Sequence, residues 1–215
     1  MKNKKVWFVT GCSKGLGYAL VNELLKQGYM VSATSRSTQA LIDAFGNESE
    51  QFLPLMVNLA DEESVKTALQ KTVLKFGRVD VVVNNAGYTH LATIEEMSDK
   101  AVRDLFDINV FGTLNVIRNV LPIMRKQNRG HIFNVSSLGA YNVGPLSGPY
   151  CATKHAIKAL SETLAMEVKQ FGIHVTDVKP GFMRTEFFGT SHKTDIAEQS
   201  PYQDLYNENM DFYNG

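Results

Sequence analysis

The chain alternates short apolar runs with longer amphipathic segments, and this alternation constrains the fold more than any other feature of the sequence. Six runs of five or six residues are rich in Val, Ile and Phe and lack strict apolar–polar alternation. Such runs are typical of strands buried on both faces of a parallel sheet. The predicted strands cover residues 6–10, 30–34, 52–57, 79–83, 131–135 and 173–178.

Helical patterns lie between these runs. They cover residues 16–27, 61–76, 98–126 and 147–171. Three of the four are followed directly by a glycine, a common helix terminator: Gly28, Gly77 and Gly172. A regular alternation of strands and helices implies right-handed crossovers between parallel strands. We therefore predict an α/β fold, a single Rossmann-like, doubly wound parallel sheet of about six strands with helices on both faces.

Composition argues against several classes of protein. The 22 basic residues are balanced by 22 acidic ones, whereas a nucleic-acid-binding protein usually has a basic excess. No segment approaches the ~18 apolar residues of a membrane helix, and none of the five histidines has a metal-ligand spacing. Cys12 and Cys151 do not form a disulfide pattern, so we expect reduced thiols and a cytoplasmic protein. We predict no nucleic acid, no membrane and no metal.

A glycine-rich turn follows the first predicted strand. Residues 10–17 read Thr-Gly-Cys-Ser-Lys-Gly-Leu-Gly and lead into a helix. Glycines let the backbone approach a ligand closely, and the free N–H groups of the helix can bind a pyrophosphate. The spacing differs from the common Gly-x-Gly-x-x-Gly fingerprint, and a tight turn without a ligand is the alternative. The strand–glycine–helix order favours a dinucleotide site.

Further motifs make the chain resemble the short-chain dehydrogenase/reductase family. The matching residues are the Asn84-Asn85-Ala86-Gly87 run, Asn109, Ser137, the Tyr150-x-x-x-Lys154 pair, and Pro180-Gly181 with Thr185. The resemblance extends from about residue 5 to residue 185, nearly the whole chain. Any one of these motifs can occur by chance, but their common order along the chain is difficult to explain that way.

Tyr150 and Lys154 are four residues apart, so on a helix they share one face. An ammonium group close to a phenol lowers its pKa, so we expect Tyr150 to act as acid and base. Ser137 would hydrogen-bond the reacting oxygen. The neighbouring Ser136 cannot be distinguished by composition; the family spacing selects Ser137. The resemblance implies that Asn109 holds a water that links Lys154 to solvent.

The resemblance also implies which residues bind the dinucleotide. They are Gly11, Ser13, Lys14, Gly15, Leu16, Gly17, Arg36, Asn58, Leu59, Asn85, Ala86, Gly87, Tyr150, Lys154, Pro180, Gly181 and Thr185. Members that prefer NAD carry an acid after the second strand, where this chain has Ser35 and then Arg36. Arginine binds a 2′-phosphate, and Lys14 can reach the same group. We therefore expect NADP(H) rather than NAD(H).

The resemblance implies hydride transfer between NADP(H) and a carbonyl or alcohol substrate. Apolar and aromatic residues near the expected site favour a largely apolar substrate: Tyr88, Leu91, Leu138, Tyr141, Val143, Phe182, Phe187 and Phe188. The alternatives are a nucleotide-sensing or partner-binding protein without turnover, and an epimerase or dehydratase. We assign residues 1–181 to cofactor binding and catalysis, and residues 182–215 to a lid or loose tail. By analogy, the two long helices would form at least a homodimer.

Overall fold

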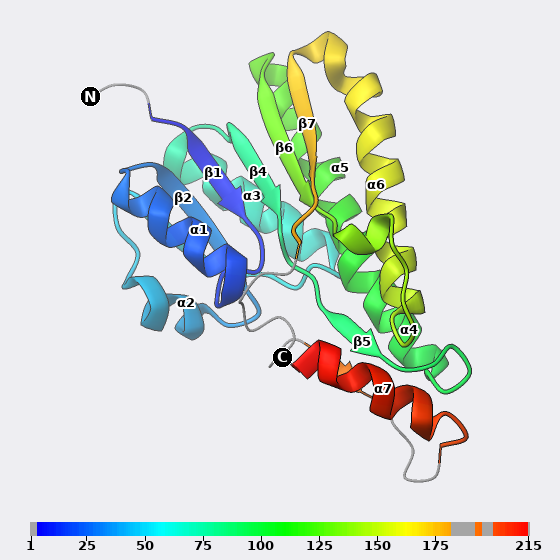
Figure 1. Ribbon diagram of the computed structural model, residues 1–215. Helices are drawn as coiled ribbons and strands as arrows, with labels where there is room; N and C mark the ends of the chain where they lie inside the picture. The colour runs from blue at the N-terminus through cyan, green and yellow to red at the C-terminus, as the bar shows by residue number, and fades with distance from the viewer. Residues whose placement is uncertain (1–3, 182–191, 195–199, 215) are drawn as a thin grey trace.

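The computed structural model describes residues 4–181, 192–194 and 200–214, and it contains the predicted sheet (Figure 1). Six parallel strands are arranged in the order β3-β2-β1-β4-β6-β7. Their bounds are β1 (Val6–Val9), β2 (Met30–Ser35), β3 (Phe52–Met56), β4 (Val81–Asn84), β6 (Gly130–Val135) and β7 (Ile173–Val178). Each strand lies within two residues of its expected bounds, so the prediction of a six-stranded parallel sheet is confirmed.

The strand order reverses between β1 and β4. The chain moves from β1 outward to β3, then returns to place β4 on the other side of β1, with Trp7 opposite both Val31 and Val81. The loops that leave the carboxyl ends of β1 and β4 therefore diverge. Such a point of reversal opens a crevice in which ligands bind in doubly wound sheets.

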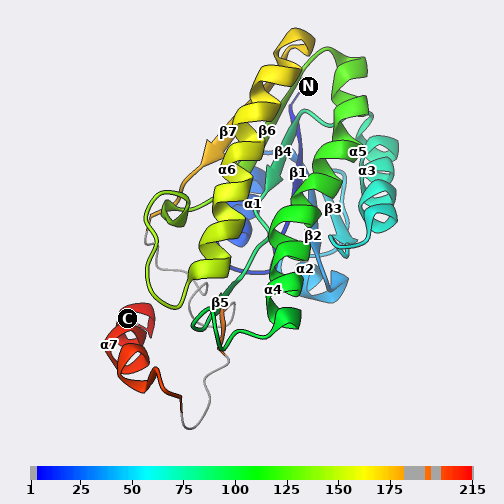
Figure 2. The same ribbon diagram turned by 90° about the vertical axis from the view of Figure 1, so that its right-hand side faces the viewer.

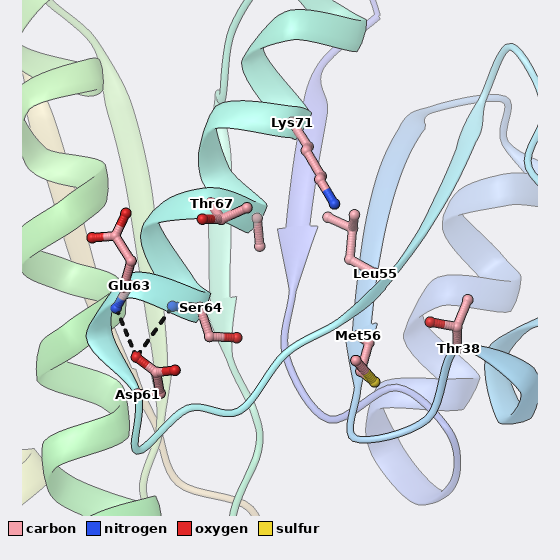
Figure 3. Close-up of a pocket in the computed structure, with 9 residues that line it drawn as sticks. Thr38, Leu55, Met56, Asp61, Glu63, Ser64, Thr67 and Lys71 are labelled. Carbon is pink, nitrogen blue, oxygen red and sulfur yellow. Dashed lines mark hydrogen bonds between the residues drawn. The ribbon is translucent and has the colours of Figure 1, made fainter.

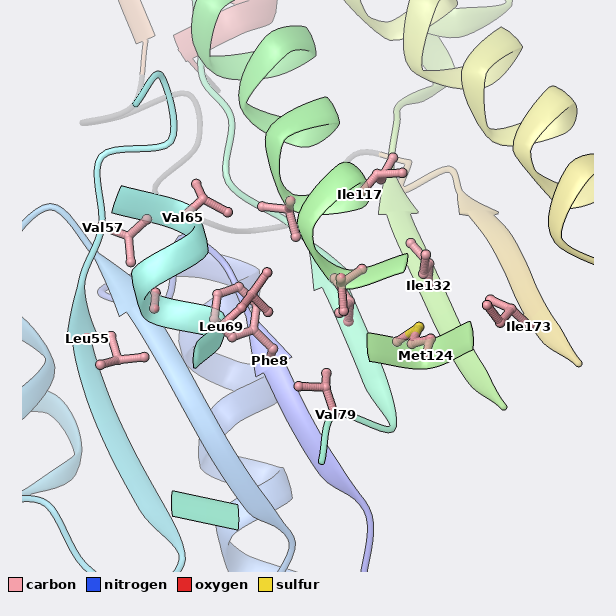
Figure 4. Packing of buried hydrophobic residues seen from close by; sticks show 14 of the residues in the cluster. Phe8, Leu55, Val57, Val65, Leu69, Val79, Ile117, Met124, Ile132 and Ile173 are labelled. Carbon is pink, nitrogen blue, oxygen red and sulfur yellow. The ribbon is translucent and has the colours of Figure 1, made fainter. Parts of the chain in front are cut away.

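Helices cover both faces of the sheet, as predicted. They are α1 (Gly15–Lys26), α2 (Thr38–Phe45), α3 (Glu62–Phe76), α4 (Asp99–Phe106), α5 (Gly112–Gln127), α6 (Gly148–Val168) and α7 (Gln203–Asn214). The face below α3, α5 and α6 forms the larger core, where Phe8, Leu69 and Ile132 pack together (Figures 2 and 4). A second core lies between the opposite face and the α1–α2 pair. Burial on both faces explains why the central strands β1, β2 and β4 are apolar without alternation.

The segment expected as one helix over residues 98–126 is divided into three parts. A π-helical turn, Asp107–Phe111, separates α4 from α5. The chain stays helical through the π turn, so no loop signal in the sequence marks the division. The short helix α2 and the two-stranded pair of β5 (Thr89–Leu91) with β8 (His192–Thr194) were not predicted. Their few residues are too short a window for a periodic signal.

Residues 182–215 were expected to form a lid or loose tail. The interpretation as a loose tail is wrong for residues 203–214, which form α7. Tyr206 of this helix packs against Leu91 and Leu146, a contact between distant segments that local periodicity does not reveal. Residues 182–191, 195–199 and 215 lie outside the described residues, and with them the predicted Thr185, Phe182, Phe187 and Phe188.

Candidate active site

The glycine turn after β1 requires two of its glycines for steric reasons. Gly11 has a φ of +69°, and a Cβ atom there would lie 2.8 Å from the Cα of Ala86. A Cβ at Gly17 would lie 2.3 Å from the carbonyl oxygen of Gly11. A side chain at either position would clash with backbone, so the turn and the start of α1 are held in close contact.

The loop after β4 braces this turn. The side-chain amide of Asn85 donates hydrogen bonds to the carbonyls of Thr10 (2.9 Å) and Gly11 (3.0 Å). In return, the Oγ1 of Thr10 accepts hydrogen bonds from the backbone N–H groups of Asn85 and Ala86, both at 3.0 Å. The two diverging loops of the crevice are therefore joined into one rigid wall.

A cavity of about 830 Å³ runs from this turn to Tyr150. The predicted residues that line it are Gly11, Ser13, Lys14, Gly15, Leu16, Arg36, Asn58, Leu59, Asn85, Ala86, Gly87, Ser137, Tyr150, Lys154, Pro180 and Gly181. Gly17 lies behind the wall against Gly11, and Asn109 lies behind it against Tyr88. The structure thus brings nearly all described members of the predicted site into one cavity.

Several cavity residues were missed by the sequence reasoning, among them Asp104, Asp107 and Ile108. They precede Asn109 on the helical segment that passes the crevice, which is the only signal the sequence offered. Burial is the main cause that raises the pKa of Tyr88, and the carboxylates of Asp104 and Asp107 raise it further. The positive charge of Arg36 acts in the opposite direction and lowers the pKa of Tyr88. Arg36 is therefore close enough to interact with this phenol.

Ser137 and Ser136 have different roles in the structure. The Oγ of Ser137 accepts a hydrogen bond from the Gly139 N–H (3.1 Å), which leaves its own proton to donate. A hydrogen bond from Ser137 lowers the pKa of Tyr150. The Oγ of Ser136, in contrast, donates to the carbonyl of Val178 at 3.3 Å and lies in the interior. Ser137 is therefore the serine that points its hydroxyl toward the tyrosine.

Lys154 is buried beside Tyr150 on α6. Its Nζ donates to the carbonyl of Val135 at 2.9 Å and lies 5.7 Å from the centroid of the Tyr150 ring. Burial lowers the pKa of Lys154 to about 8, partly opposed by the carboxylate of Asp177. The same burial raises the pKa of Tyr150 to about 12 despite the hydrogen bond from Ser137. Lys154 is not among the causes that shift the pKa of Tyr150, so the expected lowering of that pKa by Lys154 stays a prediction.

Asn109 connects the crevice loop to α6. Its Oδ1 accepts from the Tyr88 N–H at 3.1 Å, and its Nδ2 donates to the Tyr88 carbonyl at 2.9 Å and to the Oγ1 of Thr153 at 3.2 Å. Its backbone carbonyl accepts a hydrogen bond from Thr113 at 3.0 Å. The π turn gives Asn109 this inward position next to the residue that precedes Lys154. The predicted water relay remains a prediction.

The far end of the cavity carries two exposed cations. Lys14 lies at the start of α1 and Arg36 follows β2, and both line the cavity. Asn58 lines it too, and its Oδ1 accepts the Ala60 N–H at 3.2 Å. The side chain of Asn58 thus holds the local turn.

A second hollow of about 400 Å³ lies at the outer edge of the sheet, between β3 and α3 (Figure 3). Its carboxylate Asp61 is the N-cap of α3 and accepts the backbone N–H groups of Glu63 (3.0 Å) and Ser64 (3.4 Å). The acidic side chain is therefore explained by helix capping. None of the residues that line this hollow belongs to the predicted site.

Comparison with known proteins identifies the family. The model of the short chain dehydrogenase family matches residues 5–196. The chain belongs to this family. It is 39% identical over 202 residues to oxidoreductase BOA17 of Botryotinia fuckeliana, covering 93% of this chain and 73% of the relative. It is 34% identical over 196 residues to 3-ketodihydrosphingosine reductase of Bacteroides thetaiotaomicron, covering 91% and 70%.

Solved structures of similar proteins support the same family assignment. A short-chain dehydrogenase from Streptomyces avermitilis superimposes with a TM-score of 0.88 at 35% identity, over all of this chain and 79% of the other. ElxO with NADP bound gives 0.80 at 34% identity, over 86% and 76% of the chains. A 3-ketoacyl-(acyl-carrier-protein) reductase from Brucella melitensis complexed with NADH gives 0.83 at 26% identity, over 87% and 79%. The protein is an NAD(P)-dependent oxidoreductase that acts on small molecules.

Within the residues that the structure describes, no helix is both long and apolar enough to cross a membrane. Across residues 4–181 and the short described stretches beyond them, no three His, Cys, Asp or Glu side chains are grouped to hold a metal ion.

Proposed function

We propose that the protein transfers a hydride between NADP(H) and a carbonyl or alcohol substrate, with Ser137, Tyr150 and Lys154 at the reacting end of the cavity. One observation carries the proposal. The hydroxyl of Ser137, the phenol of Tyr150 and the ammonium of Lys154 converge at one end of a single cavity, and the glycine turn with its two cations lies at the other. A nicotinamide dinucleotide fits between these ends.

The dinucleotide, when bound, supplies or accepts the hydride. In reduction, Tyr150 donates its proton to the carbonyl oxygen as that oxygen gains negative charge, and an alcohol results. A pKa of about 12 keeps Tyr150 protonated at neutral pH, as a proton donor requires. Ser137 donates a hydrogen bond to the same oxygen. The charge of Lys154 stabilises the phenolate that the transfer leaves behind.

The preference for NADP(H) rests on the charges at the adenosine end. Ser35 occupies the position where an acid would bind a ribose hydroxyl, and Arg36 and Lys14 line the cavity beside it. A guanidinium can bind a 2′-phosphate with two parallel hydrogen bonds. ElxO, which binds NADP, supports this preference by similarity, whereas the Brucella reductase is complexed with NADH.

We infer a substrate whose carbonyl is attached to an apolar chain. At the substrate end of the cavity, the described lining residues of segments 89–91 and 138–147 are uncharged. They include Leu91, Leu138 and Val143. Leu138 and Val143 are also exposed at the rim. No lysine or arginine among these described residues would neutralise a carboxylate or phosphate on the substrate. The Bacteroides relative, a 3-ketodihydrosphingosine reductase, acts on a ketone of this kind by its name.

The division of the chain and its assembly are further parts of the proposal. Residues 1–181 would bind the cofactor and perform catalysis, and the remainder would cover the substrate. A homodimer would use the outer faces of α4–α5 and α6, where Phe111 and Met166 are exposed. Light scattering tests the dimer, and a monomeric mass contradicts it. The free thiols Cys12 and Cys151 suit a reducing compartment such as the cytoplasm.

Cofactor binding followed by turnover in one sample tests the function. NADPH and NADH are titrated against the purified protein, and apolar ketones and aldehydes are then added while the absorbance of the reduced nicotinamide is followed. We expect tighter binding of NADPH and oxidation that Ser137→Ala abolishes and Ser136→Ala leaves nearly unchanged. Binding without oxidation across the panel would favour a protein that senses the nucleotide, and an absence of binding would refute the proposal.

A further inference from the structure

The side chain of Tyr206 on α7 is almost completely buried, with 1% of its surface exposed. Its hydroxyl donates to the Oε2 of Glu96 at 2.7 Å and accepts the backbone N–H of Thr93 at 3.1 Å. A buried phenol needs hydrogen-bond partners, and here the segment that follows β5 provides both. The contact joins residues more than 100 positions apart in the chain.

Glu96 is the centre of this group. Its Oε2 also accepts the Oγ1 hydroxyl of Thr93 at 2.9 Å, and a further hydrogen bond comes from the side chain of Ser200. The hydrogen bonds from Ser200, Tyr206 and Thr93 lower the pKa of Glu96. The carboxylate is thus ionised at neutral pH, and the hydroxyls of Ser200 and Tyr206 both point from the C-terminal segment toward it. Hydrogen bonds to an ionised acceptor are stronger than those between neutral groups.

The same helix packs on the wall of the cavity. Tyr206 lies in one apolar cluster with Leu91 and Leu146, and the Ala92 N–H donates to the Leu146 carbonyl at 3.0 Å. Leu91 lines the cavity, as do Gly144 and Ser147 on either side of residues 145 and 146. Figures 1 and 2 both place α7 beside β5, beyond the carboxyl ends of the sheet. A displacement of α7 would therefore loosen the part of the wall that faces the substrate.

The helix also offers a matched comparison. The hydroxyl of Tyr202 donates to the Oε2 of Glu95, but this pair lies at the surface. Each pair joins a tyrosine to a glutamate of the same loop. Tyr206 lies in α7, and Tyr202 lies in the turn directly before it. They differ in burial: Tyr206 is a buried member of the apolar cluster, whereas Tyr202 packs against that cluster only partly buried and its hydroxyl pair lies at the surface.

We propose that Tyr206 and Glu96 are positioning residues that hold α7 against the β5 side of the cavity and thereby set the affinity for the carbonyl substrate. The inference rests on the proposed function, since it assigns these residues to the substrate end of the same cavity. The glycine turn and its cations are attached to other elements. Loss of the Tyr206–Glu96 contact therefore weakens substrate binding and leaves dinucleotide binding unchanged.

The test compares Tyr206→Phe and Glu96→Gln with the control Tyr202→Phe. We expect KM for the best apolar ketone to rise about 5- to 20-fold in the first two variants. Tyr206→Phe leaves the buried Thr93 N–H without its acceptor, and Glu96→Gln replaces a charged acceptor with a neutral amide that holds the Tyr206 and Ser200 hydroxyls more weakly. The dissociation constant for NADPH should stay within about twofold, as should kcat. The double variant should show less than the product of the two single effects, because both remove one contact.

Hydrogen exchange of residues 203–209 gives a readout that does not require turnover. Protection of these amides should fall in Tyr206→Phe and Glu96→Gln and be retained in Tyr202→Phe. Equal effects of Tyr206→Phe and Tyr202→Phe on KM and on exchange would overturn the inference, as would a parallel weakening of NADPH binding. If Tyr206→Phe does not fold, Glu96→Gln decides the question. If the wild type reduces no ketone, the proposed function fails, whereas the exchange experiment still tests the contact.

Discussion

The two ends of the cavity are built in different ways. At the cofactor end, the glycine turn and the loop after β4 are held by backbone groups and by the side chains of Thr10 and Asn85, which belong to those same loops. At the substrate end, the wall depends on α7, whose Tyr206 reaches back to Thr93 and Glu96. The cofactor end is built from two short motifs that follow the adjacent strands β1 and β4, whereas the substrate end also needs contacts with α7. The first can therefore be recognised from motifs in the sequence, and the second cannot.

The largest expected effect is on kcat, and it should leave the binding at both ends of the cavity unchanged. Tyr150→Phe removes the proton donor, so we expect kcat to fall by about 10²- to 10⁴-fold while the dissociation constant for NADPH is unchanged. Steady-state kinetics and a fluorescence titration measure the two quantities. A loss of NADPH affinity equal to the loss in kcat would show that Tyr150 is mainly a cofactor contact.

A second substitution tests the steric account of the cofactor end. Gly11→Ala adds a Cβ 2.8 Å from the Cα of Ala86, and overpacking of this kind costs roughly 1–3 kcal/mol. We expect weaker NADPH binding by about 5- to 100-fold. Gly77→Ala is the control, because Gly77 also has a positive φ but a Cβ there meets nothing within 4 Å. If both variants bind NADPH equally well, the close approach of the two loops is not required.

Burial of Lys154 makes stability depend on pH. Its pKa is lowered to about 8 in the folded protein, below its usual value of 10.5. Between these values the unfolded chain retains a proton that the folded chain has released, so the free energy of unfolding should rise with pH, by about 2 kcal/mol from pH 8 to pH 10. Above pH 10 the raised pKa of Tyr150 reverses the trend, because the folded protein then holds the extra proton.

Urea unfolding at a series of pH values measures this effect. Lys154→Met carries no charge at that position, and its unfolding free energy should change little between pH 8 and pH 10. A rise of the same size in the variant would assign the pH dependence to other groups. It would also remove the reason to regard the reacting end as strongly desolvated.

The smallest expected effect concerns the adenosine end. Arg36→Asp replaces a cation with a carboxylate that repels a 2′-phosphate, so we expect the ratio of NADPH to NADH affinity to fall about tenfold or more. Lys26→Asp, on the outer side of α1, is a control for the change in net charge. An unchanged ratio in Arg36→Asp would mean that Lys14 or another group discriminates the two cofactors.

The sequence by itself determined the sheet, most of its helices and the residues of the cavity. Strands buried on both faces are apolar throughout, and Tyr150 and Lys154 are spaced to share one helix face. The resemblance to the family selected Asn85 and Ser137 and supported the glycine turn. These signals lie within short stretches of chain or repeat at fixed intervals. A single sequence is enough to read them, because each depends on neighbours along the chain.

Only the tertiary structure decided the remainder. It assigned the hydroxyl of Ser136 to the Val178 carbonyl, turned Asn109 inward through a π turn, and placed Tyr206 against the cavity wall. It also showed that burial raises the pKa of Tyr150 despite the nearby Lys154. Each of these outcomes depends on which distant groups share a small volume and on how much water they exclude. Sequence spacing carries no direct record of either quantity, and for that reason these features could not be predicted from it.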